Sequence, residues 1–426
     1  MKLSAIELGA DLTALAKNLF ADIEKQTKDG PGVTRPSYGE AETRALKALE
    51  TVAQSHDIDC HYDRAANLWF ELPNSPSGPA TVIGSHLDSV PQGGNFDGLA
   101  GVIAGLLVLL HLKQTGVVPF TPIKVLALRG EESAWFGKAY MGSLALIGKL
   151  SATDLELEHR ETGQTLGSAM ADLGIPIDEI KAGKPLMDLA SMGAYLELHI
   201  EQGPTMVARR WPVSPVTGIR GNMRHNRIVC EGETGHSGAV PRWLRKDAVL
   251  AVAELLSRLD EHWRVLQQMG MDLVMTCGIV STNPVSHAVS VIPGEVSFSF
   301  EVRSQNEQTL EQFYQLMRNE CEQISQSRGV TFDFDRQLFT QPAVMDADWL
   351  KRLTQACEAY GFETENMPSG AGHDAAVFAN SGIPSGMLFI RNEHGSHNPH
   401  EAMEIDDFML GVNVLTQALV NESLNE

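Results

Sequence analysis

The sequence has few cysteines, and their number and arrangement exclude a disulfide-stapled scaffold. In 426 residues there are five cysteines, none in a CxxC pair: Cys60, Cys230, Cys277, Cys321 and Cys357. An odd, scattered set argues against a disulfide framework and favours a reducing compartment. We therefore expect a cytoplasmic protein.

Basic residues and long apolar runs are also scarce. Lys and Arg total 33 against 54 Asp and Glu, a formal net charge of −21. Nucleic acid and anionic lipid both require a basic face, so we expect neither as a partner. The longest apolar run, residues 99–110, is shorter than the ~20 residues that span a bilayer. Acidic residues interrupt the apolar N-terminal pattern, which is typical of an amphipathic helix and not of a signal peptide.

The apolar pattern that is present predicts an α/β fold. Strands are expected over residues 80–84, 123–128 and 196–200, and an almost wholly apolar helix over residues 98–112. Strands that alternate with helices indicate a mixed, largely parallel sheet with helices on both faces. Chemistry in such a sheet gathers at the carboxyl ends of the strands.

The pattern changes near Pro212, where β-type alternation with two predicted helices replaces the α/β order. The α/β order resumes after residue 331. We therefore expect a catalytic domain of residues 1–212 and 332–426, interrupted by an α+β domain of residues 213–331.

Two polar clusters follow the first predicted strands. GSHLDS and GGNFDG offer His86 and Asp97 as ligands, with Asp88 able to accept a proton from the His86 ring and orient it. RGEES places Glu131 and Glu132 side by side, so that one can bind a metal while the other acts as a base. Each cluster taken alone also fits a polar loop.

Two further clusters lie later in the chain. ELHIEQGP places His199 on a predicted strand, where a lone histidine is more often a buried structural residue, and HGSHNPHE is a loop with three histidines and an acid. All four clusters belong to one α/β domain. Together they predict imidazole and carboxylate ligands without thiolate, which suit Zn²⁺, Mn²⁺, Co²⁺ or Ni²⁺. Five ligands that share one carboxylate suit two metals about 3.5–4 Å apart.

The motifs GSHLDSVPQGGNFDG, EE, HIEQGP, GHSG, VIPGEVSFSFEVR, SGAGHDA and GSHNPHE occur in this order over nearly the whole chain. In this set the chain resembles the metal-dependent amidohydrolase branch of the M20 peptidase superfamily, which includes N-carbamoyl-L-amino-acid hydrolases, allantoate amidohydrolases and β-ureidopropionase-like enzymes. The resemblance implies Glu131 as general base. It also implies two sets of metal ligands that share Asp97: His86, Asp97 and His199 for one metal, and Asp97, Glu132 and His397 for the other.

The resemblance further implies that the inserted domain is a lid and dimerisation domain, and that the protein is a homodimer. His236 matches the lid histidine that stabilises an oxyanion. Arg303 matches the arginine that pairs with a substrate carboxylate, a task suited to the guanidinium fork. Gln202 and the backbone at Gly372 match substrate-contacting positions. From the residues alone, His236 also fits a turn cap and Arg303 a charge on the surface of a sheet.

Departures from the family pattern concern the substrate pocket. Ser290 replaces a usual substrate-contacting Asn, His287 lies in the same altered segment, and Trp135 replaces an Arg. His199 stands where peptidases of the superfamily usually have Asp or Glu, which favours the amidohydrolase branch. We expect a hydrolase of non-peptide C–N bonds that uses metal-activated water and Glu131 on a small carboxylate-bearing ureido or N-acyl compound. The alternatives are an M20 aminoacylase or dipeptidase, and a catalytically inactive binding protein.

Overall fold

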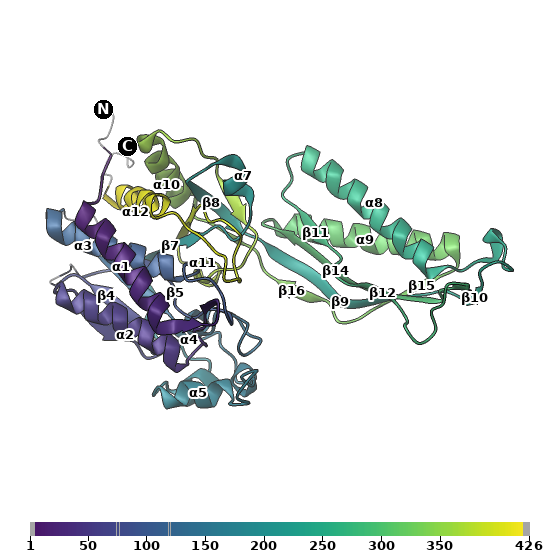
Figure 1. The fold of residues 1–426 in the computed structure, drawn as a ribbon, viewed down its shortest axis with the longest axis horizontal. Coiled ribbons are helices and arrows are strands. Elements are labelled where there is room, and N and C mark those ends of the chain that lie inside the picture. The colour runs from purple at the N-terminus through teal and green to yellow at the C-terminus, as the bar shows by residue number, and fades with distance from the viewer. Residues whose placement is uncertain (1–4, 74, 76, 118, 120, 421–426) are drawn as a thin grey trace. The chain divides into compact units, whose positions relative to one another are not determined.

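The computed structural model describes residues 5–73, 75, 77–117, 119 and 121–420. It divides the chain into two compact units (Figure 1). The first contains the residues up to Thr217 and those from Val344 onward, and the second is Gly218–Ala343. None of the helices in the described part of the chain has both the length and the apolar character needed to cross a membrane.

A nine-stranded sheet forms the centre of the first unit, in the order β17-β8-β19-β7-β5-β6-β4-β3, with β18 beside β8. The strands of this sheet are β3 (Asp59–Tyr62), β4 (Leu68–Glu71), β5 (Ala80–His86), β6 (Ile123–Leu128), β7 (Met192–Ile200), β8 (Val213–Ile219), β17 (Ala343–Val344), β18 (Met367–Ser369) and β19 (Ser385–Ile390). Strands β19, β7, β5 and β6 run parallel to one another. Their carboxyl ends therefore lie at one edge of the sheet.

Helices cover both faces of this sheet, which confirms the predicted α/β class. Side chains alternate between the faces along a strand, and on β7 Leu196 and Leu198 join the main core cluster. The ring of Tyr195, on the opposite face, packs against Phe378. The helices of this unit are α1 (Ala10–Thr27), α2 (Glu40–Ser55), α3 (Leu99–Thr115), α4 (Met141–Leu146), α5 (Leu166–Asp172), α6 (Ile177–Lys181), α7 (Thr205–Arg209), α10 (Ala347–Tyr360), α11 (Asp374–Ala379) and α12 (Ile405–Val420).

Helix α3 is the apolar helix that the sequence predicts, and every residue from Leu99 to Leu112 is buried. It approaches the sheet closely because Gly101 has no side chain. A Cβ at Gly101 would lie 2.3 Å from the carbonyl oxygen of Leu198. The helix begins directly after the polar segment that contains Asp97, so its packing helps to fix that residue.

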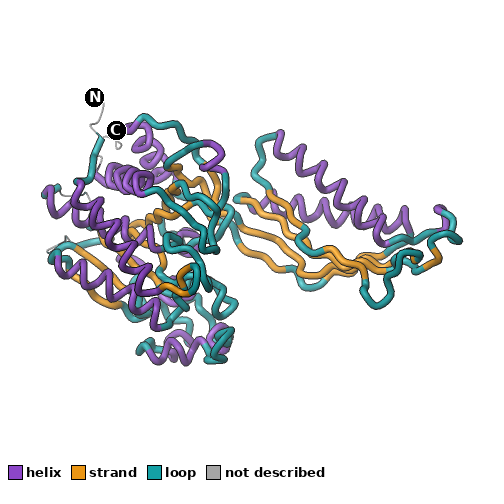
Figure 2. The backbone as a smooth tube through the Cα atoms, in the orientation of Figure 1, coloured by secondary structure: helices purple, strands orange, loops and turns teal. Residues whose placement is uncertain are grey.

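The second unit has an antiparallel sheet of six strands, in the order β11-β14-β9-β15, with β12 beside β14 and β16 beside β9. Helices α8 (Ala248–Gln268) and α9 (Glu307–Arg328) lie side by side on one face of it (Figure 2). The strands are β9 (Gly221–Glu231), β11 (Val274–Thr276), β12 (Val280–Thr282), β14 (Glu295–Ser304), β15 (Thr331–Phe334) and β16 (Leu338–Thr340). Alternate residues of β14 are buried, as expected for a sheet covered on one face.

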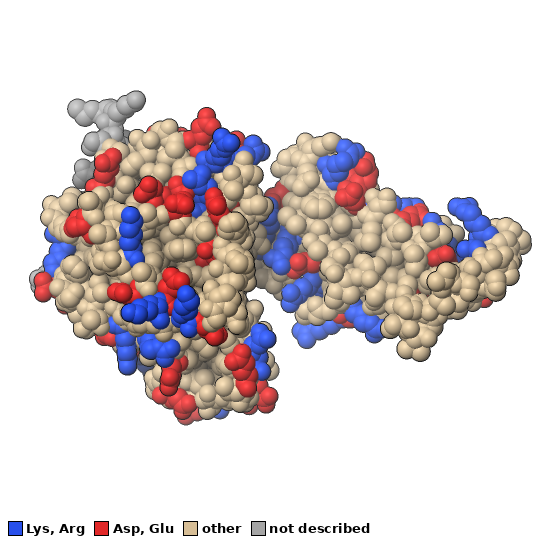
Figure 3. Space-filling model, viewed as in Figure 1, with Lys and Arg blue, Asp and Glu red and all other residues tan. Residues whose placement is uncertain are grey.

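Two short strand pairs complete the structure. β1 (Lys28–Asp29) pairs with β2 (Gly32–Val33) in the first unit. β10 (Gly235–His236) pairs with β13 (Val291–Ile292) in the second. On the face shown in Figure 3, acidic and basic side chains are interspersed over the surface of the first unit.

Candidate metal centre

The candidate site lies at the carboxyl edge of the parallel strands in the first unit. The sequence clusters reach this edge from four neighbouring strands: His86 ends β5, Glu131 and Glu132 follow β6, His199 is the penultimate residue of β7, and His397 lies in the loop after β19. Asp97 lies just before α3. Residues far apart in the chain therefore meet here because the strands that carry them are neighbours.

Asp97 lies at the centre of the first group. Its Oδ1 atom is 3.3 Å from Nε2 of His86 and 3.2 Å from Nε2 of His199, yet this buried oxygen has no hydrogen-bond partner. Ligand atoms held ~2.1 Å from a tetrahedral ion lie ~3.4 Å apart. Both distances from Asp97 Oδ1 are close to this value, and the oxygen has no other partner, so the group fits a bound cation.

The second group uses the other oxygen of Asp97. Nε2 of His397 lies 3.2 Å from Oε1 of Glu132 and 3.7 Å from Oδ2 of Asp97. Gln202, a predicted substrate contact, donates from Nε2 to Asp97 Oδ2 at 2.7 Å, and the hydroxyl of Ser396 donates to the same oxygen. Both predicted ligand sets are thus assembled around one shared carboxylate.

A third cluster of Glu197, His199 and His373 lies beside the first group. Glu197 already accepts hydrogen bonds on both oxygens, from Ser85 Oγ at 2.8 Å and from the Ala375 amide at 2.9 Å. His373 Nε2 lies 2.9 Å from Ser369 Oγ. Because its polar atoms are engaged in this way, the cluster serves better as a buried support for His199 than as a metal site.

Glu131 lies next to the two groups and belongs to neither. Its Oε2 atom is 3.9 Å from Nε2 of His86, and the residue is 8% exposed. Burial raises the pKa of the Glu131 carboxyl well above its usual range; His86 opposes the shift and the charge of Glu132 adds to it. A raised pKa makes the carboxylate a stronger base than that of an ordinary glutamate, which suits proton transfer.

Asp88 fixes the position of the two glutamates. Its oxygens accept the amide hydrogens of Glu131 and Glu132, each at 3.0 Å, and the hydroxyl of Ser37 at 2.6 Å. Oδ1 of Asp88 also lies 3.4 Å from Nδ1 of His86. This one fully buried carboxylate therefore contacts both the histidine it was predicted to orient and the loop that carries the predicted base.

The charged groups at the site change one another's pKa values. Burial alone would raise the pKa of Asp97, but His199 and His86 outweigh it and hold the pKa well below its usual range. Burial also raises the pKa of Glu132, against a hydrogen bond from His397. That same hydrogen bond raises the pKa of His397 to about 9. In the metal-free site the imidazoles and carboxylates therefore shift one another's pKa values.

Two supporting groups were not predicted from the sequence. Glu401 accepts the amide hydrogens of Phe96 at 2.7 Å and Asp97 at 3.1 Å. Its place in the GSHNPHE motif was an available signal. Glu42 accepts the Gly130 amide hydrogen at 3.0 Å and forms a buried ion pair with Arg129. Glu42 lies on α2, and nothing in its neighbouring sequence indicates this role.

Two predicted pocket positions differ in their surroundings. The ring of Trp135 is 1% exposed, stacks on His159 and donates from Nε1 to the carbonyl oxygen of Ser89 at 2.7 Å. This corrects the expectation that Trp135 alters the pocket wall, because the buried ring has no surface to offer a substrate. Gly372 lies against the hydroxyl of Tyr140, which a Cβ at this position would approach to 1.6 Å.

The other predicted residues belong to the second unit. His236 is exposed on β10, and the next residue, Ser237, donates its amide hydrogen to the carbonyl oxygen of Ser290 at 2.9 Å. His236 and Ser290 therefore lie close together. The Nδ1 atom of His287 lies 2.8 Å from the hydroxyl oxygen of Thr282.

Arg303 lies elsewhere in this unit, near the end of β14. Its Nε and Nη2 atoms donate to the two oxygens of Glu301, each at 3.0 Å. His236 lies on the strand pair of β10 and β13. This pair lies beyond the opposite end of β14, where Glu295 begins the strand (Figure 1). The 303 − 295 = 8 steps of β14 span ~26 Å.

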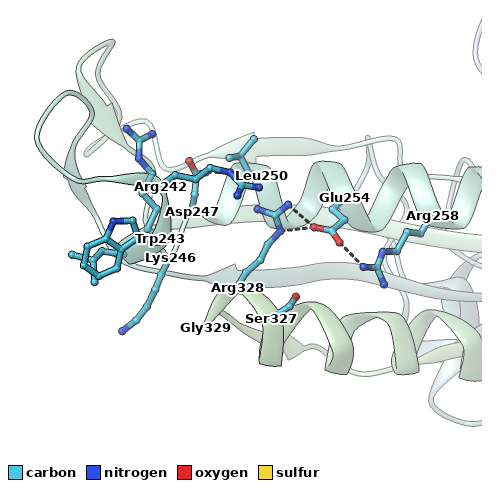
Figure 4. A pocket seen from close by; sticks show the side chains of 12 residues that line it. Arg242, Trp243, Lys246, Asp247, Leu250, Glu254, Arg258, Ser327, Arg328 and Gly329 are labelled. Atoms are coloured by element: carbon cyan, nitrogen blue, oxygen red, sulfur yellow. Dashed lines mark hydrogen bonds and ion pairs between the residues drawn. The ribbon is translucent and has the colours of Figure 1, made fainter.

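A pocket of about 590 Å³ in the second unit lies between the start of α8 and the end of α9. Glu254 lies between Arg258 and Arg328 there and pairs with both (Figure 4). Arg245, which also lines it, donates from Nε to the carbonyl oxygen of Val240 at 2.9 Å. Because these arginines already have partners, the first unit offers the better candidate site.

The chain is similar to known proteins in sequence and in fold. The profile of peptidase family M20/M25/M40 matches residues 82–421, a range that includes both ligand groups. The chain is 33% identical to an allantoate amidohydrolase from Bacillus subtilis, over 91% of this chain and 92% of that protein. It is also 33% identical to an N-carbamoyl-L-amino acid amidohydrolase from Geobacillus stearothermophilus, over 90% and 92%. A crystal structure of a hydantoinase/carbamoylase family amidase from Burkholderia ambifaria superposes with a TM-score of 0.84 at 27% identity, covering 97% of this chain and 96% of that one.

Proposed function

The chain belongs to peptidase family M20/M25/M40, and from this premise we propose that it hydrolyses a non-peptide C–N bond in a small ureido compound that carries a carboxylate. The observation that carries the proposal is the shared carboxylate of Asp97 between two groups of imidazole and carboxylate ligands, with Glu131 beside them. The amidohydrolase relatives, which match over most of the chain, support the same reaction class.

We propose that the two groups bind two divalent cations. The ligands are imidazoles and carboxylates without a thiolate, a set that suits Zn²⁺, Mn²⁺, Co²⁺ or Ni²⁺. His86, Asp97 and His199 would hold one cation, and Asp97, Glu132 and His397 the other. When bound, such cations lower the pKa of water and polarise a carbonyl oxygen.

In the proposed reaction Glu131 moves the proton. Its carboxylate takes a proton from the attacking water as the water oxygen bonds to the ureido carbon. The carboxyl then passes that proton to the leaving nitrogen as the C–N bond breaks. A terminal ureido group would yield an amine and a carbamate, and the carbamate breaks down to CO₂ and ammonia. Asp88 supports this role because it holds the Glu131 amide.

We propose that the second unit supplies substrate contacts and acts as a lid. Arg303 would bind the substrate carboxylate and His236 would stabilise the oxyanion, with Ser290 close to His236. Arg303 is already held by both oxygens of Glu301, which fixes the plane of its guanidinium. Gln202 and Gly372 would complete the contacts from the first unit.

We further propose a homodimer. His236 lies beyond one end of β14 and Arg303 near the other, ~26 Å along the strand, and a small ureido compound is much shorter than this. One copy of the unit therefore cannot place both residues on the same substrate. A second copy solves this problem if each site takes His236 from one subunit and Arg303 from the other.

A cytoplasmic location is also part of the proposal, and it is supported by five free cysteines.

A substrate panel tests the reaction. The metal-loaded enzyme is incubated with allantoate, N-carbamoyl-L-amino acids, N-acyl-amino acids and dipeptides, with ammonia and free amine as separate readouts. Ammonia release from the ureido compounds alone is the expected result. Turnover restricted to N-acyl-amino acids or dipeptides would establish the aminoacylase or dipeptidase alternative. Absence of bound metal and of any turnover would favour the catalytically inactive binding protein.

A further inference from the structure

Arg35 is a charged side chain that lies deep inside the first unit, outside every motif that predicted the site. It is 0% exposed and is among the largest fully buried side chains of the described chain. It lies between β2 and α2. A buried guanidinium is costly unless its donors are satisfied, so its contacts indicate what it does.

The hydrogen bonds of Arg35 go to residues 87–96, the segment that joins His86 to Asp97. Nε donates to the carbonyl oxygen of Leu87 at 2.6 Å, at the start of the segment. Nη1 donates to Oδ1 of Asn95 at 3.0 Å, near its end. The Arg35 backbone is paired with Ser89 in both directions, each at 3.0 Å. One side chain thus spans the segment between two predicted ligands.

The neighbouring chain strengthens this attachment. Val33 and Gly93 exchange backbone hydrogen bonds of 3.0 and 2.9 Å. Asn95, which accepts from Arg35, donates from Nδ2 to the carbonyl oxygen of Phe20 at 3.0 Å. Contacts within the protein itself therefore hold the segment at both ends and in the middle.

The charge of Arg35 also faces the site. Burial lowers the pKa of its guanidinium, and the carboxylates that oppose this shift are Glu401, Asp88, Asp97 and Glu132. The side-chain hydrogen bonds of Arg35 go to a carbonyl oxygen and an amide oxygen and not to these carboxylates. Nη2 is buried without a hydrogen-bond partner. Arg35 is thus a fixed cation near the ligands that does not neutralise any one of them directly.

We infer that Arg35 is a positioning residue for the candidate metal centre: its guanidinium fork, fixed between Leu87 and Asn95, sets the spacing of His86 and Asp97. The inference rests on the proposed function for the existence of a bound metal. A lysine keeps the charge at this position but offers a single ammonium in place of the planar fork. It therefore cannot reproduce both contacts, and Arg35→Lys separates geometry from charge.

Metal retention is the main test. Zinc is titrated out of purified wild-type protein, Arg35→Lys and Asn95→Ala with a competing chelator. Loss of a group that orients metal ligands typically weakens metal binding by ~10–100-fold. We expect a loss of this size in Arg35→Lys and a smaller loss in Asn95→Ala. The loss in the double variant should be smaller than the sum of the two single losses, because both changes break the contact between Arg35 and Asn95. Arg44→Lys, an exposed arginine on α2, is the matched control and should bind zinc as wild type does.

Two further readouts separate positioning from a structural role. Arg35→Lys should lower kcat while KM changes little. In metal-stripped wild-type protein, hydrogen exchange over residues 87–96 should already be slow, and it should be faster in Arg35→Lys. The wild-type exchange measurement remains informative even if a variant does not fold. Rapid exchange there would overturn the inference.

The outcomes also distinguish this inference from the proposed function. If wild-type protein binds zinc and folded Arg35→Lys binds it equally well, the inference is overturned and the proposed function stands. If wild-type protein binds no divalent metal, both are overturned. If zinc affinity falls as expected but no ureido compound is hydrolysed, the inference stands and the proposed reaction is overturned.

Discussion

At the scale of single residues, Asp97 places the strongest constraint on the chemistry of the site. One oxygen lies within 3.3 Å of two imidazole nitrogens, and the other lies 3.7 Å from a third. A carboxylate can serve two cations in this way because its two oxygens are separate ligands. Glu131 lies beside it without joining either group, a position that suits its proposed role in proton transfer.

Replacing Glu131 by Gln tests the proposed base. The amide keeps the shape and cannot accept the water proton, so kcat should fall by ~10²–10⁴-fold. Metal content should be unchanged, because Glu131 belongs to neither ligand group. The measurements are ammonia release and elemental analysis of the same sample. Glu161→Gln, an exposed glutamate, is the control, and near-normal turnover in Glu131→Gln would remove Glu131 from the mechanism.

Replacing Asp88 by Asn tests the anchor of the two glutamates. The amide group of Asn cannot accept on both sides, so one buried amide hydrogen of Glu131 or Glu132 loses its partner. Such a loss costs about 1–3 kcal/mol, and metal affinity should fall by ~10–100-fold. Urea unfolding and chelator competition measure the two effects. Ser37→Ala, which removes a third partner of the same carboxylate, should have a smaller effect on metal affinity.

The raised pKa of His397 predicts a pH dependence of metal binding. The hydrogen bond with Glu132 raises this pKa to about 9 in the metal-free protein, and a protonated imidazole cannot bind a cation. Below that pKa, binding must release the proton, so affinity should rise with pH by up to about tenfold per pH unit from this residue and level off above it. Chelator competition across this pH range measures the slope. An equally steep slope in His397→Ala would assign the proton to another group.

At the scale of elements, four parallel strands explain why the site forms where it does. Each strand delivers its polar residues at its carboxyl end, and the pairing of β19 with β7, β7 with β5, and β5 with β6 sets these ends side by side. The buried helix α3 then begins directly after Asp97. The position of the shared carboxylate therefore depends on how closely α3 packs on β7.

Replacing Gly101 by Ala tests this close packing. The new Cβ would lie 2.3 Å from the carbonyl oxygen of Leu198, so the helix must move away from β7. Overpacking of this kind costs about 1–3 kcal/mol, measured by urea unfolding. Gly278→Ala, whose Cβ would meet nothing within 4 Å, should change stability by less than about 0.5 kcal/mol. Equal stability of the two variants would mean that the close approach of α3 is not required.

At the scale of the whole molecule, the proposed homodimer predicts complementation between inactive variants. His236→Ala and Arg303→Ala are each expected to lose most activity. When the two variants are co-expressed and associate at random, half of the dimers contain one copy of each variant. Each of these mixed dimers has one site with both residues intact. Activity should therefore recover to about one quarter of wild type, from ½ × ½. No recovery in a verified mixed dimer would show that the two residues do not act together across subunits.

The sequence predicted much of the fold, because its strongest signals are local. The strand at residues 123–128 has the same limits as β6, and the apolar run after Gly98 forms α3. The burial of Trp135 was not predicted, since it depends on contacts with Ser89 and His159 that no local pattern reveals. The distance between His236 and Arg303 depends on how the strands pair, and the sequence did not predict it either.

The sequence by itself determined the α/β class and the kinds of ligand, because periodicity and strand-end chemistry are properties of neighbouring residues. Only the tertiary structure decided which oxygen of Asp97 faces which imidazole, and that Asp88 holds the amides of both glutamates. It alone also placed Arg35 between the two ends of the segment that joins His86 to Asp97. These contacts join residues far apart in the chain, and their distances depend on how strands and helices pack together.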